Sequence, residues 1–286
     1  MPERQAGPVA GELAEVDARE AIAEPLLRLA GHRSRDLLRD VGAQVAFLGA
    51  VTRALPGALL KPKLSRVVET VLLAHAAGVE GLPIVGLINF LVGLIIAYVG
   101  GHVLATFGAQ VFVADAIGII MVREMAPIMT GILVAGRSGS AYAAELGTMR
   151  VNEEIDALTT MGLDPVPLLV LPRVLAGTLV LPLLSLYGMA AGILAGLLHV
   201  QGLGYPIAVG WSRLATAVGV GSLVVGVAKS VVFGFLVAAV GCLRGLQTGR
   251  GASAVGRSAT RAVVAGILLV IVVDAIFAVV TTALGV

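Results

Sequence analysis

The sequence predicts an all-α integral membrane protein with an N-terminal interfacial amphipathic helix, five transmembrane helices and a short cytoplasmic helix. Hydrophobic residues make up 58% of its 286 residues and charged residues only 13%, whereas about a quarter of the residues of a soluble domain are charged. Mean hydropathy is +0.98. The charge is also uneven, since residues 1–80 hold 20 of the 38 charged residues. A polar head therefore precedes an apolar body.

We expect three regions in the chain. Residues 1–30 form a mobile extension, because their Ala, Glu and Pro show no apolar period. Residues 31–80 hold the interfacial helix and the lead-in to the first span, and residues 81–286 form the transmembrane domain. The acidic N-terminus lacks the basic and apolar regions of a signal peptide, so we expect it to stay in the cytoplasm.

The interfacial helix is predicted from apolar residues at helical spacing. Leu37, Val41 and Val45 share one face, with Ser34 as its N-cap and Pro56 with the following glycine as its end. A basic amphipathic helix just ahead of a membrane body is typical of a helix lying in the membrane interface. Packing against a soluble partner is the alternative.

Five apolar stretches are each long enough to cross a bilayer, which takes about 20 residues. We place them at Leu82–Ala105, Ile117–Ala144, Val166–Val200, Leu214–Cys242 and Ala262–Leu284. Ten Lys or Arg precede the first span and four lie between the fourth and the fifth, whereas the first-to-second connection has none. The positive-inside rule therefore places the N-terminus in the cytoplasm and the C-terminus outside.

Several functions are excluded or disfavoured by composition and motifs. A net charge of +2 argues against nucleic-acid binding, and the single cysteine, Cys242, excludes an internal disulfide. The phosphate loop G-x-x-x-x-G-K-[ST] is absent, so the chain does not hydrolyse ATP by itself. Residues 136–139 spell the G-x-S-G of intramembrane serine proteases, but Ser138 and the candidate base His199 are expected near opposite membrane faces.

A repeated glycine stripe runs along the third span at Gly188, Gly192 and Gly196. Small residues at this spacing let helix backbones approach closely in lipid. The stripe indicates intramolecular packing in preference to a dimer seam.

The most informative polar segment, residues 145–162, connects the second and third spans. Val151, Ile155 and Leu158 line one face of a predicted short helix, while acidic residues lie away from it. Gly162 is the expected C-terminal cap. The apolar face either rests on the protein's own surface or enters a groove on a soluble partner.

In this segment and on both sides of it, the chain resembles the MlaE/YrbE family of ABC-transporter permeases. The matching motifs keep their order along the sequence and are REMAPIMT (123–130), AGRSGS (135–140), AELGTMR (144–150), EEIDAL (153–158), MGLDP (161–165), PRVLAG (172–177), KSVVFG (229–234) and GRSATRAVV (256–264). The resemblance extends over residues 31–284. Residues 1–30 fall outside it and are too short for a fused STAS domain.

The resemblance implies a non-catalytic, homodimeric permease in the bacterial inner membrane that moves phospholipids or related lipids. Its implied partners are a separate ABC ATPase, which binds the ATP and magnesium, a periplasmic Mce-domain protein and a small STAS-domain subunit. It implies no cofactor on this chain. The family's coupling helix corresponds to residues 145–161, with candidate docking residues Glu145, Arg150, Glu153, Glu154, Ile155, Asp156 and Leu158.

Four charged residues stand out within the predicted spans, where each needs a partner or a watery cavity. Counting along the helices places Arg123 and Glu124 near the outer end of the second span, and Lys229 and Asp274 near the middle of theirs. We consider these four as candidates for the lipid pathway. An ion pair of Lys229 with Asp274 that only holds two spans together is the alternative. An ion-coupled secondary transporter or channel, which would need a polar path through the spans, is the alternative function.

Overall fold

The computed structural model describes residues 40–57 and 64–285, and every regular element in these two ranges is a helix. The chain divides into two compact units, Met1–Phe47 and Leu48–Val286. The packing described below lies within the second unit.

The predicted interfacial helix is helical over residues 40–57, which are the part of it that the structure describes. Val41 and Val45 are exposed on it. The proposed N-cap Ser34 lies outside the described residues, together with residues 1–39 as a whole. Contact of this helix with a membrane surface stays a prediction.

Five helical segments are long and apolar enough to cross a membrane, which confirms the predicted number of spans. They follow a shorter helix, α2 (Leu64–Val79). The segments are α3 (Leu82–Thr106), a composite segment over Gln110–Val151, a second composite over Val166–Gly202, α10 (Val220–Leu246) and α11 (Ala252–Ala283).

The two composite segments alternate α-helix with short turns of other helix types. The first contains η1 (Gln110–Phe112), α4 (Val113–Ile120), the π-helical turn η2 (Met121–Met125), α5 (Ala126–Val134), the π-helical turn η3 (Ala135–Gly139) and α6 (Ser140–Val151). The second contains the π-helical turn η4 (Val166–Val170) and α8 (Leu171–Gly202). Helix α7 (Glu154–Thr160) connects the two composites.

The predicted start of the fourth span at Leu214 is wrong. Leu214 belongs to a separate helix, α9 (Ile207–Ala217). The chain then turns extended at Val218 and Gly219, so that α10 begins only at Val220. The apolar residues continue across this break, which is why composition alone missed it. The fifth span also begins ten residues before the predicted Ala262, because α11 continues through the arginines that were assigned to a loop.

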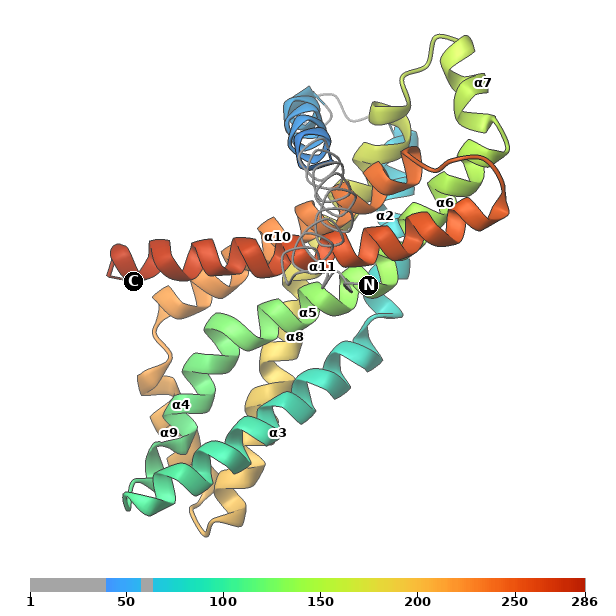
Figure 1. Ribbon diagram of the computed structural model, residues 1–286. Helices are drawn as coiled ribbons and strands as arrows, with labels where there is room; N and C mark the ends of the chain where they lie inside the picture. The colour runs from blue at the N-terminus through green and yellow to red at the C-terminus, as the bar shows by residue number, and fades with distance from the viewer. Residues whose placement is uncertain (1–39, 58–63, 286) are drawn as a thin grey trace, which may run out of the picture. The chain divides into compact units, whose positions relative to one another are not determined.

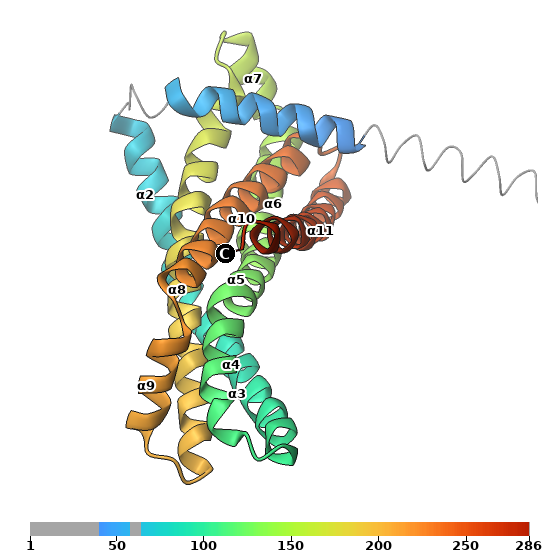
Figure 2. The ribbon, with the colours of Figure 1, turned by 90° about the vertical axis from the view of Figure 1, so that its left-hand side faces the viewer.

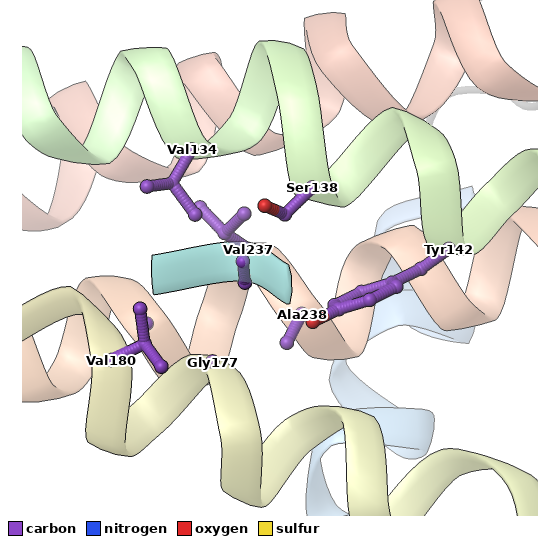
Figure 3. Close-up of a pocket in the computed structure, with 9 residues that line it drawn as sticks. Val134, Ser138, Tyr142, Gly177, Val180, Val237 and Ala238 are labelled. Carbon is purple, nitrogen blue, oxygen red and sulfur yellow. The ribbon is translucent and has the colours of Figure 1, made fainter. Parts of the chain in front are cut away.

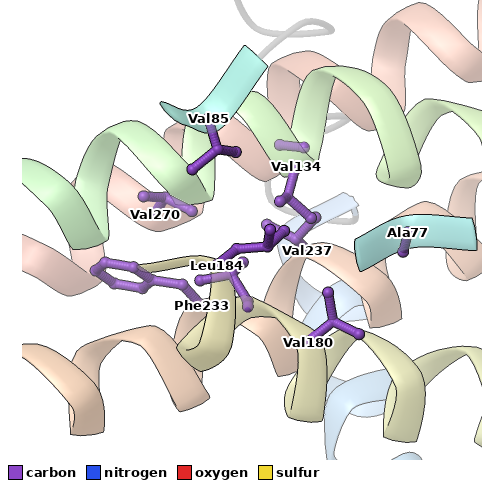
Figure 4. Packing of buried hydrophobic residues seen from close by; sticks show 10 residues of the cluster. Ala77, Val85, Val134, Val180, Leu184, Phe233, Val237 and Val270 are labelled. Atoms are coloured by element: carbon purple, nitrogen blue, oxygen red, sulfur yellow. The ribbon is translucent and has the colours of Figure 1, made fainter. Parts of the chain in front are cut away.

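Helix α8 is the centre of the second unit and packs against α2, α3, α5 and α10. Figures 1 and 2 show α7 at one end of this unit and α9 at the other. A buried apolar cluster joins the helices between these ends, and its side chains converge in Figure 4. Its labelled members are Ala77, Val85, Val134, Val180, Leu184, Phe233, Val237 and Val270.

Glycines set the closest helix contacts. A Cβ at Gly234 of α10 would lie 2.4 Å from the carbonyl oxygen of Gly177 on α8. A Cβ at Gly192 of the predicted stripe would lie 2.2 Å from Met121 Cε, and one at Gly196 would lie 2.7 Å from Ile117. The stripe therefore packs against helices of its own chain, as the sequence indicated.

Replacing Gly234 by alanine should destabilise the fold. The added Cβ meets backbone, which cannot rotate away as a side chain can, so we expect a loss of about 1–3 kcal/mol. Gly256→Ala on α11 is the matched control, because a Cβ added there would meet no neighbouring atom within 4 Å. Thermal unfolding of the detergent-solubilised variants measures both. Equal melting temperatures for the two variants would contradict the close α8–α10 contact.

Candidate functional site

The four charged residues predicted for the membrane spans lie together in one cluster. Lys229 on α10 contacts the carboxylate of Glu124 on η2, and its Nζ lies 2.9 Å from Asp274 Oδ1 on α11. Arg123 Nε lies 3.6 Å from Glu124 Oε1. The pairing of Lys229 with Asp274 that the sequence allowed is therefore present, within a larger network.

The burial of this charge cluster is uneven. The Lys229 side chain has no exposed surface, whereas those of Asp274, Arg123 and Glu124 are 15%, 21% and 27% exposed. A buried ammonium needs opposite charge nearby, and two carboxylates supply it. The Lys229–Asp274 contact is an ion pair without an aligned hydrogen bond. Two cations and two anions leave the cluster formally neutral.

Arg123 also contacts α11 through a residue that the sequence did not single out. Its Nη2 donates a hydrogen bond of 2.9 Å to Thr281 Oγ1. The Thr281 hydroxyl in turn donates to the carbonyl oxygen of Phe277 at 2.8 Å. Arg123 therefore ties η2 to α11 on the more exposed side of the charge cluster. This contact could not be predicted from the spacing of residues along the sequence, since Arg123 and Thr281 are 158 positions apart.

A π-helical turn presents Arg123 and Glu124 to the other helices. Pro127 lies four residues after Arg123, lacks a backbone N–H and crowds the carbonyl four positions earlier. An α-helical hydrogen bond is thus missing at η2, and such interruptions widen the helix locally. Prolines two positions into the following helix also accompany η4, where Pro172 comes after residues 166–170.

The predicted difference in depth between Glu124 and Lys229 is wrong, because the two side chains are in contact. The helical segment begins at Gln110 instead of the predicted Ile117, so Glu124 lies farther along it. Lys229 is only nine residues beyond the start of α10 at Val220. Both shifts bring Glu124 and Lys229 to a common depth, where they meet.

A second ion pair holds α9 against α4. Arg213 binds Asp115 with two hydrogen bonds, of 3.1 Å from Nε to Oδ1 and 2.7 Å from Nη2 to Oδ2. The Arg213 guanidinium also lies 4.2 Å from the ring centroid of Phe112. Hydrogen bonding to Asp115 raises the pKa of Arg213. Sequence reasoning missed this forked contact, which fixes the helix just before the break at Gly219.

The predicted coupling helix over residues 145–161 is in fact two helices. Helix α6 ends at Val151, and Glu153 then adopts a left-handed conformation with φ of 61°. This turns the chain into α7, so Glu145 and Arg150 lie on the end of the second span and not on α7. Gly162 caps α7 as predicted, with φ of +75°, and Leu163 N donates to Leu158 O at 3.0 Å.

The apolar residues of this segment do not all face outward. Ile155 is buried in the chain itself with 4% of its surface exposed, so it anchors α7 to its own protein. Leu158 is half-buried. Met161 and Leu163 are exposed, at 66% and 46%. Because the sequence predicts docking by this segment, we call Leu158 of α7, with Met161 and Leu163 just beyond its end, the α7 docking surface.

The charged candidates of the segment pair largely within the chain. Asp156 forms an ion pair with Arg150, which links α7 to α6. Glu154 accepts a 3.1 Å hydrogen bond from Asn152. Glu145 accepts a 3.1 Å hydrogen bond from Arg173 of α8. Exposed pairs such as Arg150–Asp156 contribute little stability, typically below about 1 kcal/mol.

Ser138 of the G-x-S-G motif lies in a small cavity of about 10 Å³. Figure 3 shows its hydroxyl directed toward this cavity, whose wall also includes Val237 and Tyr142. His199 instead lines a different pocket and packs against Tyr98, with ring centroids 5.2 Å apart. The serine and the histidine thus occupy separate places, as expected for a chain without protease chemistry.

Replacing Lys229 by methionine should destabilise the protein strongly. The change leaves the Glu124 and Asp274 carboxylates facing each other without the ammonium, at an expected cost of about 3–5 kcal/mol. Adding Asp274→Asn should recover part of the loss, because the double variant keeps one cation, Arg123, with one anion, Glu124, and the cluster is neutral again. Thermal unfolding in detergent tests this. A Lys229→Met variant as stable as the parent would show that the ion pairs of Lys229 contribute no net stability.

The sequence matches the family described as permease MlaE over residues 70–280. A probable ABC transporter permease protein of Rickettsia bellii is 32% identical over 246 residues, which cover 85% of this chain and 92% of that protein. The intermembrane phospholipid transport system permease protein MlaE of Haemophilus influenzae is 30% identical over 247 residues, 84% of this chain and 95% of that protein.

A plant relative matches over a shorter stretch. The chloroplastic protein trigalactosyldiacylglycerol 1 of Arabidopsis thaliana is 39% identical over 153 residues, 53% of this chain and 44% of that protein. The family match covers the spans, the charge cluster and α7. The chain therefore belongs to the MlaE permease family, as the non-catalytic, multi-pass membrane subunit of an ABC transporter.

Proposed function

We propose that this permease moves phospholipids or related lipids between the bacterial inner membrane and a periplasmic Mce-domain protein, and so maintains the lipid asymmetry of the outer membrane. The observation that carries the proposal is the neutral charge cluster of Arg123, Glu124, Lys229 and Asp274 inside the spans. The Haemophilus relative, whose name states intermembrane phospholipid transport, supports the choice of substrate.

The uneven burial of the charge cluster suits a lipid headgroup. Arg123 is its most accessible cation, and a guanidinium binds phosphate oxygens through forked donors. A phosphodiester can replace the 3.6 Å Glu124 contact of Arg123. Lys229 stays enclosed and keeps both carboxylates in place. The headgroup thus gains one charged contact without breaking the core of the cluster, and it can be released again.

The alternative of an ion-coupled transporter or channel needs a continuous polar path. The buried Asn89 instead donates to Val85 O at 2.9 Å and contacts Thr130 Oγ1 at 3.5 Å. These contacts tie α3 to its own backbone and to α5. Membership of an ABC permease family also favours ATP as the energy source.

In the proposed assembly, a separate ATPase hydrolyses the ATP, as in other ABC transporters. Two copies of this chain form the pathway and bind two ATPase subunits, which hold the ATP and magnesium. A STAS-domain subunit accompanies the ATPase. The N-terminus faces the cytoplasm and the C-terminus the periplasm, which follows the distribution of Lys and Arg in the connections.

The α7 docking surface would meet the ATPase on the cytoplasmic side. Leu158, Met161 and Leu163 would enter its groove, because they are the apolar residues of the segment that its own chain leaves accessible. Glu153 is exposed at the start of α7 and would meet basic groups of the ATPase. Ile155 supports this surface from within.

Reconstitution of the complex with its ATPase tests the function directly. Proteoliposomes carrying a fluorescent phospholipid in one leaflet should show lipid movement that requires ATP hydrolysis. An ATPase variant without its catalytic glutamate is the control. ATP hydrolysis without lipid movement, or with dissipation of an ion gradient instead, would overturn the proposal.

The double variant Leu158→Glu/Met161→Glu should lose coupling to the ATPase. Placing charges on an apolar contact should weaken ATPase binding about tenfold or more, measured by co-purification and by lipid-stimulated ATP hydrolysis. Thr160→Glu on the same helix is the matched control, since it adds a charge without removing an apolar residue. Unchanged binding and hydrolysis in the double variant would place the docking surface elsewhere.

A further inference from the structure

A buried arginine connects α6, which leads into α7, to helix α2. Arg173 is 7% exposed and lies near the start of α8. Its Nη2 donates to Glu145 Oε2 of α6 at 3.1 Å, and its Nη1 donates to the carbonyl oxygen of Leu169 at 2.7 Å. Nη1 also lies 4.0 Å from Glu69 Oε1 of α2. Three helices thus meet at one guanidinium.

The two acidic partners of Arg173 are not held equally. Glu145 is within hydrogen-bond distance, whereas the 4.0 Å contact to Glu69 is an ion pair too long for a hydrogen bond. Arg173 Nε is buried and has no hydrogen-bond partner. The guanidinium therefore has donor capacity left over, and a small shift of α6 relative to α2 would change which carboxylate it holds.

The connection to α7 runs through α6. Asp156 of α7 pairs with Arg150, and Glu145 lies on the same helix five residues before Arg150. Contacts therefore run without a break from α7 through α6 to Glu145 and Arg173. On the far side, α2 packs against α8 and receives Arg137 of η3, whose Nη1 donates to Ala77 O at 3.2 Å.

We propose that Arg173 is a positioning residue that transmits movement of the ATPase-docking segment to α2 by sharing its guanidinium between Glu145 and Glu69. The proposal rests on the proposed function. Packed elements with two discrete ion-pair arrangements are the physical means by which such coupling passes between sites. Arg173 contacts neither the lipid cluster nor α7 in this role, and acts only through its two carboxylates.

The test compares lipid moved per ATP hydrolysed in proteoliposomes of the complex with its ATPase. Arg173→Lys keeps the charge but loses the fork that reaches both acids, and we expect the ratio to fall about fivefold while assembly and basal hydrolysis stay unchanged. Glu69→Gln should lower the ratio similarly, and the double variant should be no worse than either. Arg257→Lys is the control, because Arg257 is exposed and bonds Ser253 on its own helix.

Glu69→Gln decides the matter if Arg173→Lys fails to assemble, because it leaves the hydrogen bond between Arg173 and Glu145 intact. A parental ratio in Glu69→Gln overturns the role of Arg173. That result differs from a failure of the proposed function, in which the parent complex hydrolyses ATP but moves no lipid and the inference falls with it.

Discussion

The enclosure of the Lys229 ammonium is the constraint on which the rest of the transmembrane arrangement depends. An ionised side chain without exposed surface inside membrane spans must be matched by opposite charge, and here the match comes from η2 and α11. The helical elements η2, α10 and α11 must therefore keep the relative positions in which these side chains are in contact. The glycine contacts of α10 help to keep these positions, since a Cβ at Gly226 would meet the carbonyl oxygen of Val122, next to Arg123.

In the proposed function, the same geometry serves both stability and lipid binding. A neutral cluster with a buried centre and a more exposed arginine can accept an anionic group at its edge while its centre holds the helices together. The ion pairs near α7 follow a different pattern, because Arg173 and Arg150 join separate elements through partly exposed carboxylates. We infer a rigid charged centre in the spans and adjustable charged links at the docking end.

The number of spans could be predicted from the sequence, because the length of an apolar stretch reflects the thickness of the bilayer. The candidate charged residues could also be named, since Lys229 and Asp274 stand out in apolar runs. Three features could not be predicted: the break before α10, the turn at Glu153 and the π-helical turn at Arg123. Each depends on local backbone geometry or on distant partners such as Thr281, which leave no periodic signal.

The proposed passage of lipid headgroups past the charge cluster can be tested directly. The measurement is photo-crosslinking of the assembled transporter with a phospholipid that carries a reactive headgroup, followed by peptide mass spectrometry. We expect ATP-dependent labelling of peptides that contain Arg123 or Glu124, the two most exposed members of the cluster. Labelling confined to the outward-facing residues of α11, such as Val264 and Leu268, and insensitive to ATP would contradict a headgroup path through the cluster.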